Sequence, residues 1–451
     1  MSTVDGQAAV PVEIDLGHGH QTSRPEDERM RVVRAQLEHL FPPARFPMRL
    51  AFGAVPEGWR EIEAWRVIPR RDAPRFLVPV EPTAAARTVL SHNGLRTRKV
   101  AATRRLAALA MRPLAAVTGD RTVLRLSAPD RIDDADIEQA VITRHLRRRL
   151  PQATSTAISL RDFHPRAKPT VQLVDDDGRV VAFAKVASDP TTGERVLTEA
   201  DLMDQLGAGL DPAISPIRLP TVLDTGRCGP FAYSVVEPLP DDARRVKPDD
   251  EALVLRALAA FGGGRSAVRT MPLAQTALWD DVMARATAAQ PARAARPDLV
   301  AGLDRLTATA LRLDAAVAVP VGRYHGDWTP WNMGISNGVI WAWDLEYGSP
   351  QGPLGLDALR WTFQVQHVTG GATFTEAVAA MTAAAPHVLA PLGVPTTLTT
   401  TLVRFHVIET MATALGLLAS GRGLPDGLDP DAVEVMRSLE GPHIPPAQRR
   451  P

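Results

Sequence analysis

The sequence contains little cysteine, little lysine and no excess of charge of either sign. Its 451 residues include one cysteine, Cys228, so no disulfide can form within the chain, which fits a reducing cytoplasm. The formal net charge is zero, which excludes a general electrostatic attraction to nucleic acid or membrane. No uncharged apolar run reaches the length of a membrane span, and the polar N-terminus is unlike a secretory signal. We therefore expect a cytoplasmic protein with no nucleic-acid partner and no transmembrane segment.

The composition is that of a large globular chain. Hydrophobic residues make up 45% and charged residues 23%, so two or three domains are expected. The basic residues are almost all arginine, and the only lysines are Lys99, Lys168, Lys185 and Lys247. A lysine retained in such a chain raises the question of why arginine would not serve at that position.

A hairpin signal lies near residue 337. Asn337-Gly338 is typical of a two-residue turn in which both positions need positive φ, and apolar residues flank it. Counting outward from the turn predicts that Asn332 lies opposite Trp343, so that Asn332 and Asp344 come to the same end of the hairpin. Asp327 lies in the loop before the first strand. Two carboxylates and an amide oxygen suit a hard cation such as Mg²⁺, although each could also be an ordinary turn residue.

These residues carry a family resemblance. His325-Gly326-Asp327 followed by Asn332 resembles the catalytic-loop signature of aminoglycoside phosphotransferase-like kinases, which share the protein-kinase fold. Asp344 is similar to the metal-binding aspartate of that family, and Asp357 to a further aspartate that supports its site. The N-terminal third of the chain has no counterpart in the family pattern.

The resemblance implies roles in phosphoryl transfer for each of these positions. Asp327 would accept or orient the proton of an acceptor hydroxyl, while Asn332 and Asp344 would hold Mg²⁺. His325 and Asp357 would brace the loop rather than react. Three further positions stay open: Trp328 and Trp331 either wall the acceptor pocket or pack, and Glu346 supports the metal or contacts the acceptor.

Lys185 is expected to need an anion. It lies in a predicted strand whose two faces are both mainly apolar, and burial of an unpaired ammonium would be costly. In the following helix, Glu199 falls on the apolar stripe by helical spacing, whereas Glu194 in the first turn is a weaker rival. A buried structural salt bridge is the plain interpretation. The resemblance implies instead the ion pair with which kinases hold ATP phosphates.

Two further segments bear on nucleotide binding. The loop from 161 to 168 stands where kinases place a glycine-rich flap but contains no glycine, which leaves Arg166 or Lys168 to contact phosphate. Glu237-Pro238-Leu239-Pro240 resembles the hinge between kinase lobes. Proline has no N–H to donate, so the amide of Leu239 is the expected contact for adenine, beside Glu237.

The expected fold class is α+β: a bilobal protein-kinase-like fold, with a small antiparallel β lobe, a helical large lobe and an N-terminal α/β extension. The expected parts are a disordered tail over 1–30, the extension over 31–150, the small lobe over 151–240, the large lobe over 241–440 and a tail over 441–451. Within the extension we expect strands over 48–82 and 123–126 and helices over 83–118 and 137–150. Large-lobe helices are expected over 252–261, 273–288, 299–315, 357–368, 374–384 and 398–418.

One stretch of the extension is one-sided in charge. Between Glu81 and Asp120 there is no acidic residue, whereas seven basic ones occur: Arg87, Arg96, Arg98, Lys99, Arg104, Arg105 and Arg112. The segment over 83–118 is interpreted as a solvated helix face, because like-charge runs usually only solvate. The alternative is contact with an anion, a membrane surface or a partner.

The resemblance implies an ATP- and Mg²⁺-dependent enzyme that phosphorylates a hydroxyl of a small molecule, of the aminoglycoside, sugar or amino-alcohol type. A protein substrate is disfavoured because Gly326 replaces the arginine that reads a phosphorylated activation loop. Asp344 and Asp357 are also too close in sequence to enclose a long activation segment. The residues indicate no oligomeric state. The alternative function is a catalytically weak kinase-like binding or regulatory module, docking to an anionic surface through 83–118.

Overall fold

The computed structural model describes residues 9–16, 25–71, 73–91, 93–160, 169–211, 213–263, 269–421, 423–424 and 431–441. The chain divides into two compact units. Unit 1 comprises Met1–Asp204 and Pro220–Ala243, and unit 2 comprises Gln205–Leu219 and Arg244–Pro451. Unit 1 is built on one large, mostly antiparallel sheet, and unit 2 is mainly helical, so the expectation of an α+β fold is confirmed. The tail expected over 441–451 lies outside the described residues from residue 442 onward.

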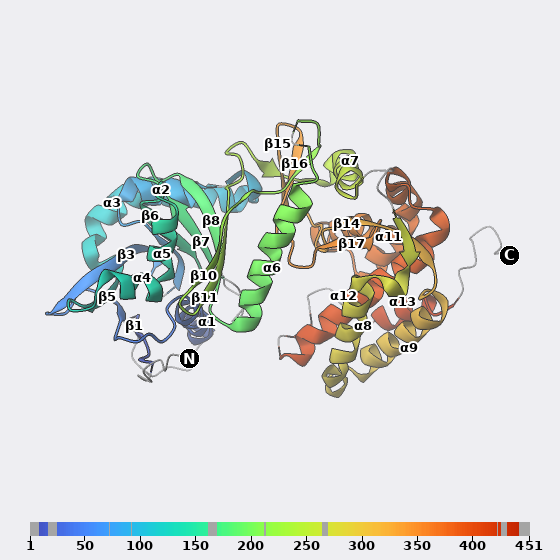
Figure 1. Ribbon diagram of the computed structural model, residues 1–451, viewed down its shortest axis with the longest axis horizontal. Helices are drawn as coiled ribbons and strands as arrows, with labels where there is room; N and C mark the ends of the chain where they lie inside the picture. Colours follow the sequence, from blue (N-terminus) through green and yellow to red (C-terminus); the bar gives the residue numbers. More distant parts are fainter. Residues whose placement is uncertain are drawn as a thin grey trace, which may run out of the picture. The chain divides into compact units, whose positions relative to one another are not determined.

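Among the described residues, the sheet of unit 1 has ten strands in the order β1-β2-β5-β3-β4-β6-β7-β8-β11-β10. Figure 1 labels most of these strands, among them the neighbours β8, β11 and β10. The strands are β1 (Glu13–Asp15), β2 (Arg49–Phe52), β3 (Trp59–Arg70), β4 (Ala73–Val78), β5 (Val123–Pro129), β6 (Ser155–Ser159), β7 (Thr170–Val174), β8 (Val180–Ala187), β10 (Val222–Cys228) and β11 (Phe231–Val236). The first five precede the predicted small lobe in the sequence, and β4 pairs with β6 through Phe76↔Ser159 and Leu77↔Ile158. The N-terminal strands therefore continue the small-lobe sheet.

Both faces of this sheet are covered by helices. Neighbouring strand residues alternate between two apolar clusters, because successive side chains of a strand point to opposite faces: Leu77 belongs to one cluster and Val78 to the other. The larger cluster includes residues of α1 (Pro25–Leu40), α4 (Asp134–Ala140) and α5 (Ile142–Arg149), and the smaller one residues of α2 (Pro82–Leu90) and α3 (Arg98–Thr118).

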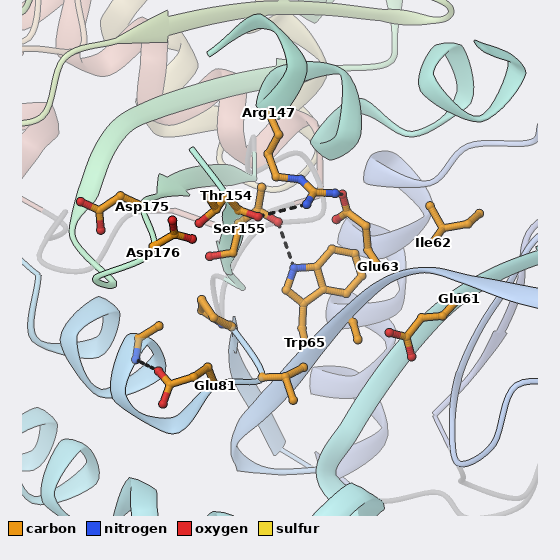
Figure 2. Close-up of a pocket in the computed structure, with 15 residues that line it drawn as sticks. Glu61, Ile62, Glu63, Trp65, Glu81, Arg147, Thr154, Ser155, Asp175 and Asp176 are labelled. Carbon is orange, nitrogen blue, oxygen red and sulfur yellow. Dashed lines mark hydrogen bonds and ion pairs between the residues drawn. The ribbon is translucent and has the colours of Figure 1, made fainter. Parts of the chain in front are cut away.

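Trp65 of β3 ties the N-terminal strands to β6. Its side chain is 1% exposed, its ring lies 5.8 Å from that of Phe41, and its Nε1 donates a hydrogen bond of 3.1 Å to Oγ1 of Thr156. Figure 2 shows the indole beneath Arg147, which forms an ion pair of 2.6 Å with Glu63. The buried contacts of the N-terminal strands are therefore shared with residues of the small lobe.

Three local expectations are wrong. The tail expected over 1–30 is wrong for β1, which pairs in parallel with β2 because Ile14 and Leu16 are buried in the larger cluster. The single helix expected over 137–150 is two helices, because Val141 adopts an extended backbone between α4 and α5. The helix expected over 273–288 begins at Ala277, where Thr276 accepts a hydrogen bond from Trp279 N and caps the helix.

Unit 2 combines helices with two small sheets. Its helices are α7 (Glu251–Phe261), α8 (Ala277–Ala288), α9 (Pro297–Leu313), α10 (Leu356–Gln364), α11 (Phe374–Leu389), α12 (Thr399–Ala419) and α13 (Ala432–Ser438). One sheet has the order β12-β15-β16-β9, and the other the order β13-β14-β17. Their strands are β9 (Ile217–Arg218), β12 (Arg244–Arg245), β13 (Arg269–Pro272), β14 (Ala318–Tyr324), β15 (Met333–Ser336), β16 (Val339–Ala342) and β17 (Ser349–Pro353).

One helix in the described part of the chain, Thr396–Ala419, is long and apolar enough to cross a membrane by length and composition. However, 67% of its apolar window is buried inside the molecule. It also carries Arg404, which is 2% exposed and pairs with Asp314 at 2.5 Å. The helix packs as a core helix of unit 2.

Replacement of Trp65 by alanine tests whether the N-terminal strands and the small lobe unfold as one body. We expect Trp65→Ala to lower the free energy of unfolding by about 3–5 kcal/mol, because a fully buried indole leaves a cavity. Trp65→Phe, which mainly removes the hydrogen bond to Thr156, should cost only about 1 kcal/mol. Urea unfolding followed by far-UV circular dichroism measures both. A change below about 1 kcal/mol in Trp65→Ala would contradict the shared core.

Candidate functional site

The hairpin of β15 and β16 has the predicted turn and register. Asn337 and Gly338 adopt φ values of 49° and 76°, and Ser336 pairs with Val339. Beyond the strands, Trp343 N donates a hydrogen bond of 3.1 Å to the carbonyl oxygen of Asn332. Asp344 follows with a φ of 70°, a left-handed conformation that is rare for a residue other than glycine.

Asn332 holds the carboxylate of Asp327. Its Nδ2 donates hydrogen bonds of 2.6 Å to Oδ2 of Asp327 and 3.2 Å to the backbone oxygen of the same residue. The side chain of Asn332 is buried, with 5% exposed. Because the amide nitrogen is used on Asp327, the amide oxygen is the atom that remains for a cation.

The loop before the hairpin is clamped by Asp357, at the start of α10. The carboxylate of Asp357 accepts hydrogen bonds from the backbone N–H groups of His325 (2.8 Å) and Gly326 (3.1 Å). The ring of His325 is fully buried, and its Nδ1 accepts a hydrogen bond of 3.2 Å from the N–H of Asp327. Burial raises the pKa of Asp357 to about 7, against the two N–H groups and Arg360, which lower it.

Asp327 titrates close to neutral pH. Burial raises the pKa of its carboxyl to about 6, and the negative charges of Asp344 and Glu346 add to the rise. The charge of Arg360 and the hydrogen bond from Asn332 act in the opposite direction. A carboxylate with a pKa near the working pH is suited to accept a proton from a hydroxyl group.

A buried ionic network behind the loop escaped the sequence interpretation. Arg360 lies one helical turn after Asp357 on α10, so the two side chains share a helix face. It donates hydrogen bonds to Glu409 Oε2 (2.5 Å) and to the hydroxyl of Tyr324 (3.3 Å). Glu409 is 3% exposed within the apolar helix α12. In the sequence, the only signals of this network are Glu409, the single acid of an apolar helix, and Arg360, the single arginine of another.

The two tryptophans of the loop differ. Trp328 is fully buried, stacks on Phe261 with ring centroids 6.0 Å apart, and meets the ring of His325 edge-on at 5.4 Å. Trp331 is 41% exposed. Of the two open interpretations, packing therefore holds for Trp328, and only Trp331 presents an accessible ring.

In unit 1, the predicted ion pair forms. Lys185 of β8 donates a hydrogen bond of 2.6 Å from Nζ to Oε1 of Glu199, on α6 (Pro190–Gly207). The Lys185 side chain is 28% exposed and that of Glu199 is 3% exposed. The rival Glu194 pairs instead with Arg227 at 2.5 Å. The carboxylate is thus buried, while the side chain of its lysine partner is partly exposed.

The structure gives less information on the other residues predicted to contact the nucleotide. Lys168 and Arg166 lie outside the described residues. Oε1 of Glu237 accepts hydrogen bonds of 2.8 Å from both the N–H and the hydroxyl of Thr221, which occupies that side chain within unit 1. Leu239 follows β11 in a half-buried stretch.

The acidic residues around the hairpin fit a divalent cation. Across the described ranges, no group of three or more His, Cys, Asp and Glu side chains could hold a metal ion by itself. Mg²⁺, however, is usually bound through one or two carboxylates together with substrate phosphates. The negative charges of Asp344 and Glu346 raise the pKa of Asp327, and a bound cation would relieve this repulsion.

A cavity of about 490 Å³ lies elsewhere, in unit 1 (Figure 2). Its lining includes Trp65, Arg147 and several acids, among them Glu61, Glu81, Asp175 and Asp176. None of the predicted site residues that the structure describes lines it. This cavity is therefore separate from the candidate site. The candidate site is assigned from the chemistry of its side chains.

Comparisons with known proteins give one family match. Residues 166–340 match the model of the phosphotransferase enzyme family, a range that contains Lys185, Glu199, Asp327 and Asn332 and ends before Asp344. No curated protein matches the chain. The resemblance seen in the His325-Gly326-Asp327 motif is thus confirmed, and with it the expectation of a small-molecule kinase.

Several solved structures are similar to this chain at low identity. One is a complex of amicoumacin kinase with AMP-PNP and Ca²⁺, at 14% identity and a TM-score of 0.40, covering 61% of this chain and 84% of that one. A GDP complex of aminoglycoside 2'-phosphotransferase-IIIa has 16% identity, a TM-score of 0.42 and coverages of 66% and 96%. A putative fructosamine-3-kinase from Thermobifida fusca has 15% identity and a TM-score of 0.43, covering 66% of this chain and 98% of that one.

Substitution of Gly326 tests the tight approach of the loop to its surroundings. A Cβ added there would lie 2.3 Å from the carbonyl oxygen of Tyr347, at a φ of 83°. We expect Gly326→Ala to cost at least about 3 kcal/mol of folding free energy. Gly338→Ala is the matched control, because its φ is 76° with nothing within 4 Å, and it should cost about 1–2 kcal/mol. Equal losses in urea unfolding would show that the close approach has no effect.

Proposed function

We propose, on the premise that residues 166–340 match the phosphotransferase enzyme family, that this chain transfers the γ-phosphate of MgATP to a hydroxyl group of a small molecule. The observation that carries the proposal is the buried carboxylate of Asp327. Asn332 fixes its position through a 2.6 Å hydrogen bond, and its pKa is raised to about 6. It is a positioned base at the mouth of a hairpin.

Asp327 acts on the acceptor. In its deprotonated form it accepts a hydrogen bond from the acceptor hydroxyl. It takes the proton as the hydroxyl oxygen attacks the γ-phosphorus and the bond from that phosphorus to the β-phosphate oxygen breaks, so that ADP leaves. The hydrogen bond from Asn332 keeps one carboxylate oxygen in place and leaves the other for the hydroxyl. Asp357 and the His325 ring act indirectly, because their hydrogen bonds hold the backbone of the loop that carries Asp327.

Asn332 and Asp344 would hold Mg²⁺ through the amide oxygen and a carboxylate oxygen. The ion, when bound, neutralises charge on the nucleotide phosphates. The left-handed backbone at Asp344 supports this role, because strained conformations of non-glycine residues concentrate at ligand-binding positions.

Lys185 would bind the α- and β-phosphates. Its partner Glu199 is 3% exposed, so the ion pair holds the ammonium group in place. Arginine would bring a planar guanidinium group instead of this compact charge. Lys168 and the Leu239 amide are proposed as further nucleotide contacts. Glu237, whose Oε1 is occupied by Thr221, would shape the hinge segment rather than bind the base.

The acceptor is proposed to be a small hydroxylated compound of the aminoglycoside, sugar or amino-alcohol type. Gly326 stands at the position where protein kinases use arginine, and a Cβ there would collide with Tyr347. A panel of such compounds, assayed by ADP release with MgATP, identifies the substrate. Exposed Trp331 offers an apolar surface for the acceptor.

Asp327→Asn should abolish phosphate transfer, because the amide cannot accept the proton. In the wild-type protein the rate should fall as the pH drops through the pKa of Asp327, since protonation removes the base; bound Mg²⁺ should lower that pKa below the value of about 6 that the residue has without the ion. Both effects are measured by ADP release with an acceptor from the panel. The control is nucleotide binding: Asp327→Asn should keep the thermal stabilisation that MgATP gives. Transfer that persists in Asp327→Asn would exclude this residue as the base.

Asp344→Ala should remove the Mg²⁺-dependent part of the stabilisation by ATP. In the wild-type protein, MgATP should raise Tm more than ATP with EDTA does, because Asp344 would help to hold the ion that neutralises the phosphates. In Asp344→Ala the two shifts should be equal. Asp249→Ala, at an exposed acid of unit 2, is the matched control and should behave as wild type. A wild-type Mg²⁺ effect in Asp344→Ala would contradict the metal assignment.

A further inference from the structure

Helix α3 turns apolar side chains toward solvent. Leu106 is 68% exposed, Leu109 78% and Val117 84%. The inward side of the helix, which packs on α2, contributes only Met111 to the buried residues. Surface helices of globular proteins normally have the opposite arrangement, with the apolar stripe toward the core.

These side chains form one continuous face. Leu106, Leu109, Pro113 and Val117 follow one another at intervals of three or four residues, the spacing that places side chains on the same side of a helix. The helix has 21 residues, so the face runs along a cylinder about 30 Å long. Contiguous exposed apolar surface of this kind marks an interaction site.

A row of cations borders this face. Arg98, Arg105 and Arg112 are exposed and recur every seven residues, so they line one edge of the helix. The whole stretch from Pro82 to Gly119 contains no acidic residue, although the chain as a whole has a net charge of zero. The solvated-face interpretation of 83–118 accounts for the arginines but leaves the exposed leucines unexplained.

We propose that α3 is a docking surface for an anionic lipid bilayer, on which the helix lies parallel to the membrane plane. Leu106, Leu109 and Val117 enter the boundary between headgroups and acyl chains, and the arginine row pairs with lipid phosphates. Arginine can bury its aliphatic stem while its guanidinium stays at the headgroups, which suits a position at the edge of the apolar face.

Charge distinguishes this occupant from a second copy of the chain. Two α3 helices packed face to face in antiparallel orientation would bring two arginine rows together, and in either orientation the segment has no acid to compensate them. A bilayer containing anionic lipid supplies a flat apolar layer and negative charge together. The proposal does not depend on the phosphotransferase chemistry.

The test is flotation of the full chain with vesicles of phosphatidylcholine alone or mixed with phosphatidylglycerol. Binding is expected only to the mixed vesicles and should weaken as salt rises, since surface charges are screened. The double variant Leu106→Gln/Leu109→Gln should lose about tenfold or more in partitioning, because each leucine contributes apolar burial. Arg98→Gln/Arg105→Gln should also bind less, and its remaining binding should depend less on salt.

Leu311→Gln is the matched control. Leu311 is 55% exposed on α9, so this variant loses an exposed helical leucine elsewhere and should partition as wild type. The far-UV circular dichroism spectrum and the urea unfolding midpoint of Leu106→Gln/Leu109→Gln should match those of the wild type, which shows that the variant is folded. The proposal is overturned if mixed vesicles do not bind the protein or bind Leu106→Gln/Leu109→Gln equally well. Binding to soluble polyglutamate without vesicle binding, or dimerisation that requires Leu106 and Leu109, would overturn it as well.

Discussion

One buried carboxylate determines the shape of the loop that carries the proposed base. The two oxygens of Asp357 each receive a backbone N–H, at 2.8 and 3.1 Å, from the consecutive residues His325 and Gly326. A turn held at two adjacent amides has little freedom, and the left-handed glycine fits only because it has no side chain. The side chain of Asp327 therefore points in a fixed direction, in which Asn332 donates a hydrogen bond to its carboxylate.

The charge arrangement around the loop is layered. Asp357 and Arg360 lie on one face of α10, and Arg360 is in turn neutralised by Glu409 of α12. The arginine lowers the pKa of Asp327, whereas burial and the acids near the hairpin raise it. A nearly neutral pKa thus results from opposing effects of separate elements, and a change in any one of them would shift the protonation of the base.

What could be predicted from the sequence was local. The turn at Asn337-Gly338 follows from backbone chemistry, and the partner of Lys185 follows from period-two and helical spacing. The pairing of β4 with β6 joins segments that are far apart in the sequence, and no pattern within either strand specifies its neighbour. The network of Arg360 and Glu409 depends on how α10, α12 and β14 meet. For α3, periodicity identified a helix but could not decide which side would face the core.

The continuous sheet of unit 1 has a mechanical consequence. Strand β8, which carries Lys185, and helices α2 and α3 are parts of one hydrogen-bonded and packed body. Such a body transmits displacement without much bending, because close-packed interiors resist compression. Any contact that holds α3 in one orientation would thereby also hold the ammonium group of Lys185. Binding at the N-terminal third of the chain would thus affect the position of the cation proposed to bind phosphate.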